Sequence, residues 1–247
     1  MCIVSIVNYW DSVGREMTPQ LEHCLFNEMK LLKNHWMEQY RSFDNSQRQF
    51  IDTTLNQMLT EAQKIKADGL CANNLRDRIK FSGDNESNEF IHVMCCCFIE
   101  WIEHNGMELQ KELYKHSERG ADNWFPVVII TEQINELSVA DEQITVYRGC
   151  HNGQLEDEIY RNRQSWTTDV EVAKKFAFGS PSTEQLKQES VVLKGVVART
   201  DILWDRGYES EMVLRMGFNP ISLERMDITY DDYLSEQNIA VYDSTLA

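Results

Sequence analysis

The sequence is poor in positive charge. It has 24 lysines and arginines against 40 aspartates and glutamates in 247 residues, so the formal net charge at pH 7 is −16. Unspecific nucleic-acid binding depends on basic side chains that neutralise phosphate groups. The composition therefore excludes a globally attractive surface for nucleic acid, although it leaves room for a local basic patch. A basic partner or a basic substrate surface is the easier expectation.

Long apolar runs and a disulfide framework are also missing. The N-terminal stretch Met1–Val7 lacks the basic region of a signal peptide, and no window approaches the roughly 18 apolar residues that span a bilayer. The seven cysteines are odd in number, and Cys95, Cys96 and Cys97 are consecutive. No C-x-x-C pair is available for zinc. We therefore expect a cytoplasmic protein with reduced thiols, no metal and no membrane contact.

Common nucleotide and hydrolase motifs do not occur. The chain has no G-x-G, no P-loop, no H-E-x-x-H and no G-x-S-x-G. Cys150 and His151 are neighbours, but adjacent residues of a strand point to opposite faces and cannot form a local dyad. A dinucleotide could bind this chain only without a glycine-rich loop at a helix N-terminus.

Residues 1–135 are predicted to be mainly helical. Thr18 and Pro19 have the pattern of an N-cap followed by proline at the first helical position. Further helices are expected around residues 51–65 and from Ser87 onward. Apolar residues at helical spacing mark these segments: Leu21, Leu25, Leu32, Trp36 and Tyr40 in the first, and Phe90, Met94, Cys97 and Trp101 in the third. The cysteine triplet therefore falls inside a helix, where core packing is its expected role.

From about residue 141 the pattern changes to short strands. The segments rich in β-branched residues are Ile144–Tyr147, Ser190–Ala198, Glu211–Leu214 and Ile239–Tyr242. Thr168–Glu171 has the pattern of a capping box, which would open a short helix with Val172, Ala173, Phe176 and Ala177 facing inward. We expect an α+β protein in which the helical region 1–135 packs on a mostly antiparallel sheet in 136–247.

Three signals follow one another along this second half. The first is Val146-Tyr147-Arg148-Gly149, and the second is Ser165-Trp166-Thr167-Thr168 with an A-x-x-F-A helix at 173–177. The third is the E-x-E of Glu209 and Glu211, followed by an apolar strand. Each is common alone, and Glu156-Asp157-Glu158 is a second E-x-E that precedes the serine strand. Their order and spacing together are informative.

This combination resembles the R-S-E branch of mono-ADP-ribosyltransferases, which includes many bacterial toxins and phage-encoded modifying enzymes. The resemblance covers about residues 120–247 and implies an ADP-ribosyltransferase-type β-sandwich core with NAD as co-substrate. One departure is Trp166, which stands where the family's S-T-S motif has a small residue.

The resemblance implies a role for each motif residue. Arg148 would grip the NAD pyrophosphate through bidentate contacts, and Gly149 would let the backbone approach the nicotinamide amide. Phe176 would stack on the nicotinamide ring, unless it only faces the core. Glu211 would stabilise the oxocarbenium-like centre that forms when the nicotinamide–ribose bond breaks, and Ser165 would hold Glu211 in place.

The acceptor is implied to be macromolecular. On a strand, Glu209 would share a face with Glu211 and would orient or deprotonate the acceptor, while Trp204 and Tyr208 would contact it or anchor its loop. A glutamate at position 209 favours a protein arginine. The alternative acceptor is an RNA or DNA base, modified by an intracellular toxin of a toxin–antitoxin or phage-defence system that has an antitoxin or immunity protein as partner. A binding module without turnover and a structural protein with chance motifs are the remaining alternatives.

Overall fold

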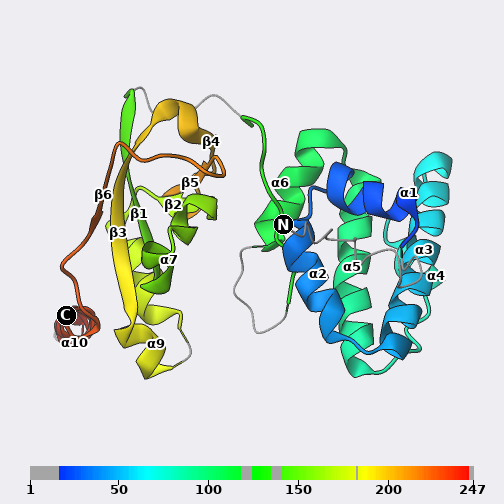
Figure 1. Ribbon diagram of the computed structural model, residues 1–247, viewed down its shortest axis with the longest axis horizontal. Coiled ribbons are helices and arrows are strands. Elements are labelled where there is room, and N and C mark those ends of the chain that lie inside the picture. The colour runs from blue at the N-terminus through cyan, green and yellow to red at the C-terminus, as the bar shows by residue number, and fades with distance from the viewer. Residues whose placement is uncertain (1–16, 118–123, 135–140, 182, 245–247) are drawn as a thin grey trace, which may run out of the picture. The chain divides into compact units, whose positions relative to one another are not determined.

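The computed structural model describes residues 17–117, 124–134, 141–181 and 183–244 (Figure 1). The chain divides into two compact units, Met1–Ile129 and Ile130–Ala247. The boundary expected between residues 135 and 136 lies outside the described residues, as does the N-terminal stretch Met1–Val7.

The first unit is helical, as the sequence predicts. Its elements are α1 (Pro19–Glu22), the π-helix η2 (His23–Glu28), α2 (Lys33–Ser42), α3 (Asn45–Asp68), α4 (Asn74–Arg78), α5 (Asn85–Glu103) and α6 (Gly106–Ser117). Thr18 caps α1 as expected, and Pro19 occupies its first turn. The apolar stripe from Leu21 to Tyr40 does not form one helix, because the chain leaves η2 and Leu31 pairs with Val128 before α2 begins.

The two long helices of this unit start at aspartate caps. Asp44 forms a reciprocal capping box with Gln47 at α3, and the Asp84 side chain accepts a hydrogen bond from the Ser87 backbone at α5. The expected apolar faces are buried. Cys95 and Cys97 lie in that core as predicted, whereas Cys96 is only half-buried. Burial raises the pKa of the Cys95 thiol to about 11.

The second unit combines helices with one antiparallel sheet. Its strands are β1 (Gln143–His151), β2 (Ser165–Thr167), β3 (Ser190–Ala198), β4 (Ile202–Asp205), β5 (Glu211–Leu214) and β6 (Ser222–Arg225). Its helical segments are α7 (Gly153–Glu156), η3 (Ile159–Asn162), α8 (Val170–Lys174), the π-helix η4 (Lys175–Gly179), α9 (Glu184–Gln188), η5 (Arg199–Asp201), η6 (Tyr208–Ser210) and α10 (Tyr230–Ser244).

The six strands lie in the order β4-β5-β2-β1-β3-β6, and every neighbouring pair is antiparallel. All strands within the described residues belong to this one sheet, where a sandwich of two sheets was expected. One face carries a cluster around Val146, Trp166 and Met212. The other face carries Val192 packed with Ala173, Ala177 and Phe178 of α8 and η4. The mixed helix and sheet composition is confirmed.

Two predictions that concern the helices α10 and α8 of this unit were wrong. Residues 239–242 belong to α10 and not to a strand. The helix starts at a reciprocal cap, in which Thr229 donates from its backbone to Asp232 and accepts from the Asp232 backbone with its hydroxyl. The cap of α8 is Asp169, one residue later than predicted, because its carboxylate accepts from the Glu171 backbone at 2.8 Å.

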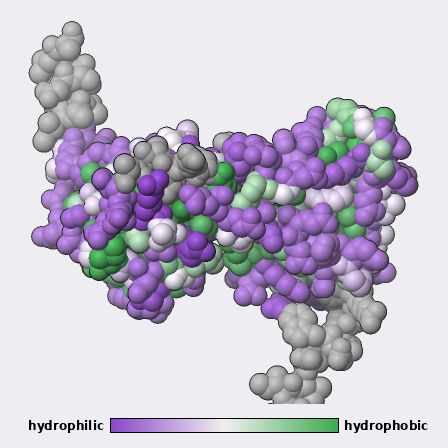
Figure 2. Space-filling model, turned by 90° about the horizontal axis from the view of Figure 1, so that it is seen from above, coloured by the Kyte–Doolittle hydropathy of each residue, from purple (hydrophilic) through white to green (hydrophobic). Residues whose placement is uncertain are grey.

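The side of the molecule seen in Figure 2 is mostly hydrophilic, with small scattered apolar areas. In the part of the chain that the structure describes, no helix is long and apolar enough to cross a bilayer.

Candidate active site

The three strands that carry the motif residues are neighbours in the sheet. Arg148 lies on β1, Ser165 on β2 and Glu211 on β5, and the sheet order places β2 between β1 and β5 (Figure 1). In the sequence β5 is separated from β2 by two other strands, so this adjacency is not a consequence of chain order. The fold thus brings the three motif segments together at the middle of the sheet.

Glu211 is a buried carboxylate with a strong cationic partner. Its side chain is 8% exposed, and one of its oxygens, Oε2, lies 2.6 Å from Nη1 of Arg206. The Arg206 backbone N–H also donates to the Glu211 carbonyl at 3.0 Å. The pairing of Arg206 with Glu211 was not predicted from the sequence. A buried glutamate needs a cation or several hydrogen-bond donors, so a glutamate at the start of an apolar strand is a signal for a basic partner nearby.

Arg206 is itself held by two aromatic rings. The guanidinium carbon lies 5.9 Å from the Trp204 ring centroid and 5.5 Å from that of Tyr208, and the side chain is 11% exposed. Trp204 is buried while Tyr208 is 63% exposed. Of the two aromatic residues proposed for acceptor contact, Trp204 therefore anchors the loop, and only Tyr208 presents its ring to solvent.

Thr167, and not Ser165, lies opposite Glu211 in the β2–β5 ladder. The register pairs Thr167 with Glu211 and Ser165 with Val213. The Thr167 hydroxyl donates to the Glu209 carbonyl at 2.8 Å and accepts from the Asp169 backbone. The hydroxyl nearest in register to the buried carboxylate is therefore that of Thr167, which fastens the turn before β5 to the end of β2.

Arg148 reaches the edge of β2 from the other face of the sheet. Cross-strand partners share a face, so Glu211 lies on the face of Thr167 and Tyr147. Arg148 is the next residue after Tyr147 and starts from the opposite face. Its guanidinium donates from Nη1 to the Ser165 carbonyl and from Nε to Gln154 Oε1 at 3.4 Å.

Glu209 does not lie on a strand, so the prediction that it shares a face with Glu211 was wrong. It belongs to η6 and has a left-handed backbone with φ of 52°, and Ser210 has the same φ. Strand β5 begins only at Glu211. The Ser210 carbonyl accepts from the Thr168 backbone at 3.0 Å, so Thr167 at the end of β2 and Thr168 after it hold the two strained residues. The half-exposed Glu209 is presented by a turn next to Tyr208.

Gly149 and Phe176 have different surroundings from those expected. A Cβ at position 149 would lie 2.0 Å from the Ala173 carbonyl oxygen, so this glycine permits close packing of the α8–η4 backbone on β1. Phe176 was expected to face inward but is 47% exposed, while Phe178 fills the core. Its core alternative was wrong, and its ring is accessible for stacking.

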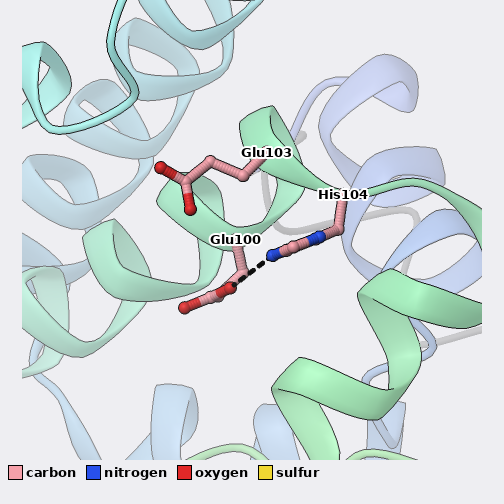
Figure 3. Close-up of side chains that lie close together, drawn as sticks. All are labelled: Glu100, Glu103 and His104. Atoms are coloured by element: carbon pink, nitrogen blue, oxygen red, sulfur yellow. Dashed lines mark ion pairs between the residues drawn. The ribbon is translucent and has the colours of Figure 1, made fainter.

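Other groups of reactive side chains have structural explanations. Cys150 is buried and its thiol pKa is raised by burial, while the exposed His151 pairs with Glu189 at 3.0 Å. At the C-terminal end of α5, Glu100, Glu103 and His104 group together (Figure 3).

In this group His104 Nε2 lies 3.5 Å from a Glu100 oxygen, and His116 pairs with the other Glu100 oxygen at 3.8 Å. Both Glu100 oxygens therefore have a histidine nitrogen as neighbour.

No protein-family model, curated protein or solved structure matches the chain.

Proposed function

We propose that the chain is an NAD-dependent mono-ADP-ribosyltransferase, with Glu211 as its catalytic carboxylate. The observation that carries the proposal is the adjacency of β5, β2 and β1, which brings Glu211, Ser165 and Arg148 into one region of the sheet. The resemblance to the R-S-E family rests on the same three segments. The buried position of Glu211 supports a specific role, since a glutamate on a strand is ordinarily exposed.

The chemistry requires one carboxylate near the ribose. The bond between C1′ of the ribose and the nicotinamide nitrogen breaks, and nicotinamide leaves with the bonding electrons. Positive charge develops at C1′ and the ring oxygen, and an ionised Glu211 beside the ribose stabilises it. The acceptor atom then bonds to C1′ and loses a proton. With water as acceptor, the products are nicotinamide and ADP-ribose.

Arg148 would supply the phosphate contact. It starts from the face opposite Glu211, and β2 pairs with β1 only at Tyr147, so the ladder between these strands ends beside it. Binding of NAD would replace the Ser165 carbonyl by phosphate oxygens as partners of the guanidinium. Charge-assisted contacts to phosphate are stronger than those to a neutral carbonyl, which favours this exchange.

A protein arginine is the proposed acceptor. Glu209 lies half-exposed in the turn beside Tyr208, where a carboxylate could bind an incoming guanidinium. A nucleic-acid acceptor would gain from a basic patch on this loop. Arg206, the loop's own basic residue, is instead buried against Glu211. The net charge of −16 also disfavours a nucleic-acid acceptor.

The test is to incubate the protein with NAD labelled on the adenylate portion in a cell lysate. We expect nicotinamide release and a label that protease removes from the macromolecular fraction, whereas a label removed by nuclease would indicate the nucleic-acid acceptor. Glu211→Gln should fold and abolish both release and incorporation. Glu158→Gln, in the E-x-E segment at residues 156–158, is the matched control and should retain activity. A folded Glu211→Gln variant with full activity would overturn the proposal.

A further inference from the structure

We propose that Arg206 is a positioning residue that holds the Glu211 carboxylate in a fixed direction for the cleavage of NAD. This inference rests on the proposed function. The observation that supports it is the short ion pair between Arg206 Nη1 and Glu211 Oε2 at 2.6 Å. Both side chains of this pair are almost fully withdrawn from water.

Burial makes the partner necessary. Removing a carboxylate from water favours its neutral form, and a guanidinium at hydrogen-bonding distance restores the preference for the charged form. A neutral carboxyl at position 211 would offer the oxocarbenium-like centre little stabilisation. Arg206 therefore places a positive charge directly against the buried Glu211 carboxylate.

The loop after β4 fixes the orientation of the Arg206 guanidinium. Arg206 directly follows β4, and its backbone N–H donates to the Glu211 carbonyl at the start of β5. The Trp204 and Tyr208 rings approach the guanidinium within 5.9 Å and 5.5 Å. Only a side chain with limited rotational freedom can hold one carboxylate oxygen in a constant direction. The pair thus fixes the orientation of the Glu211 carboxylate.

The opposite role would be masking, in which the ion pair neutralises Glu211 until a substrate displaces Arg206. The two roles predict opposite effects of removing the guanidinium. A positioning residue gives a slower enzyme when it is lost, whereas a masking residue gives a faster one. The sign of the change in kcat therefore decides between them.

The experiment measures nicotinamide release from NAD by full-length Arg206→Met, with water as acceptor. We expect kcat to fall by about 10²-fold, while KM stays within about threefold of the wild-type value because the cofactor contacts remain. Arg206→Lys keeps the positive charge without the forked geometry of the guanidinium. Its kcat should therefore lie between the values of the wild type and Arg206→Met. Arg161→Met is the control, because Arg161 is an arginine at the surface paired with Glu158, and it should leave kcat unchanged.

Chemical rescue separates positioning from a loss of folding. Arg206→Ala leaves space for a small guanidinium compound, and added methylguanidinium should restore part of kcat in a saturable manner, while it leaves the wild type and Arg161→Met unaffected. If Arg206→Met does not fold, Arg206→Gln replaces it, because glutamine keeps a donor without the charge.

Different results would refute the proposed function and the proposed role of Arg206. A wild-type protein that does not cleave NAD would refute the proposed function itself. An active wild type with an equal or higher kcat in folded Arg206→Met or Arg206→Gln would overturn only the role of Arg206. Reduced kcat with rescue by methylguanidinium supports it, and reduced kcat without any rescue contradicts it.

Discussion

The carbonyl oxygen of Ala173 occupies the space where a side chain of residue 149 would begin. A Cβ at position 149 would lie 2.0 Å from that oxygen and 2.4 Å from the Ala177 nitrogen, and both atoms belong to backbone that cannot rotate away. We expect Gly149→Ala to destabilise the second unit by about 1–3 kcal/mol or more, since the α8–η4 segment must move from β1. Thermal or denaturant unfolding measures this loss.

Gly195 is the matched control. It lies on the neighbouring strand β3, and a Cβ there would meet nothing closer than 3.6 Å. Gly195→Ala should therefore leave the unfolding transition nearly unchanged. Equal stability of Gly149→Ala and the wild type would show that the helical segment does not pack on β1 as described.

Arg148 is expected to bind NAD. Arg148→Ala removes a charge-assisted phosphate contact worth about 1.5–3 kcal/mol, so the dissociation constant for NAD should rise about 10- to 100-fold. Isothermal titration calorimetry with Glu211→Gln as background avoids turnover during the measurement. Arg161→Ala should bind NAD as the parent does. An unchanged affinity of Arg148→Ala would place the cofactor elsewhere.

The Asp84 cap of α5 should weaken in acid. Hydrogen bonds from the Ser87 backbone and hydroxyl hold the pKa of the Asp84 carboxyl below its usual value. A lowered pKa in the folded state stabilises the protein above the pKa of the unfolded carboxyl, and this contribution disappears as the pH falls through the folded value. The loss therefore begins near pH 4 and continues below it.

Comparison with Asp84→Asn isolates this contribution from that of the other carboxylates. Asparagine keeps the capping oxygen but does not titrate in this range. The difference in unfolding free energy between wild type and variant should be constant near neutrality and shrink toward low pH. A difference that does not depend on pH would contradict the assignment of the cap to the ionised carboxylate.

Local patterns predicted the elements whose side chains alternate or repeat clearly. Strand β3 follows the β-branched run Ser190–Ala198, and α3 and α5 follow apolar helical spacing. Strand β6 could not be predicted in this way, because Ser222–Arg225 contains one apolar residue and is defined by its pairing with β3. The helical state of residues 239–242 depends on the cap at Thr229, ten residues earlier. A short stretch of sequence centred on the apolar residues 239–242 does not include this cap.

Predictions about the site failed where they assumed regular backbone. Glu209 and Glu211 are two residues apart, but two left-handed residues precede β5 and break the alternation between them. Arg206 contacts Glu211 across a loop, and a sequence does not reveal which cation reaches a buried carboxylate. The register that places Thr167 opposite Glu211 likewise results from strand pairing over a long separation.

Glu209 is expected to act on the acceptor and not on NAD. Guanidinium is protonated at neutral pH and is a poor nucleophile until a carboxylate binds it or takes its proton. Glutamine at position 209 can accept a hydrogen bond but cannot take that proton. Glu209→Gln should therefore largely spare nicotinamide release, which we propose to depend on Glu211, and suppress transfer to arginine.

The substitution leaves the turn intact, because Thr167 binds the backbone carbonyl of Glu209 and not its side chain. Glu158→Gln is the matched control, since Glu158 also has a left-handed backbone, with φ of 54°, and ends the other E-x-E segment. The paired assay measures nicotinamide release and label incorporation for the wild type and both variants. Neutral nucleobase amines need no such proton removal, so unimpaired incorporation into nuclease-sensitive material by Glu209→Gln would replace the arginine acceptor with a nucleic-acid base.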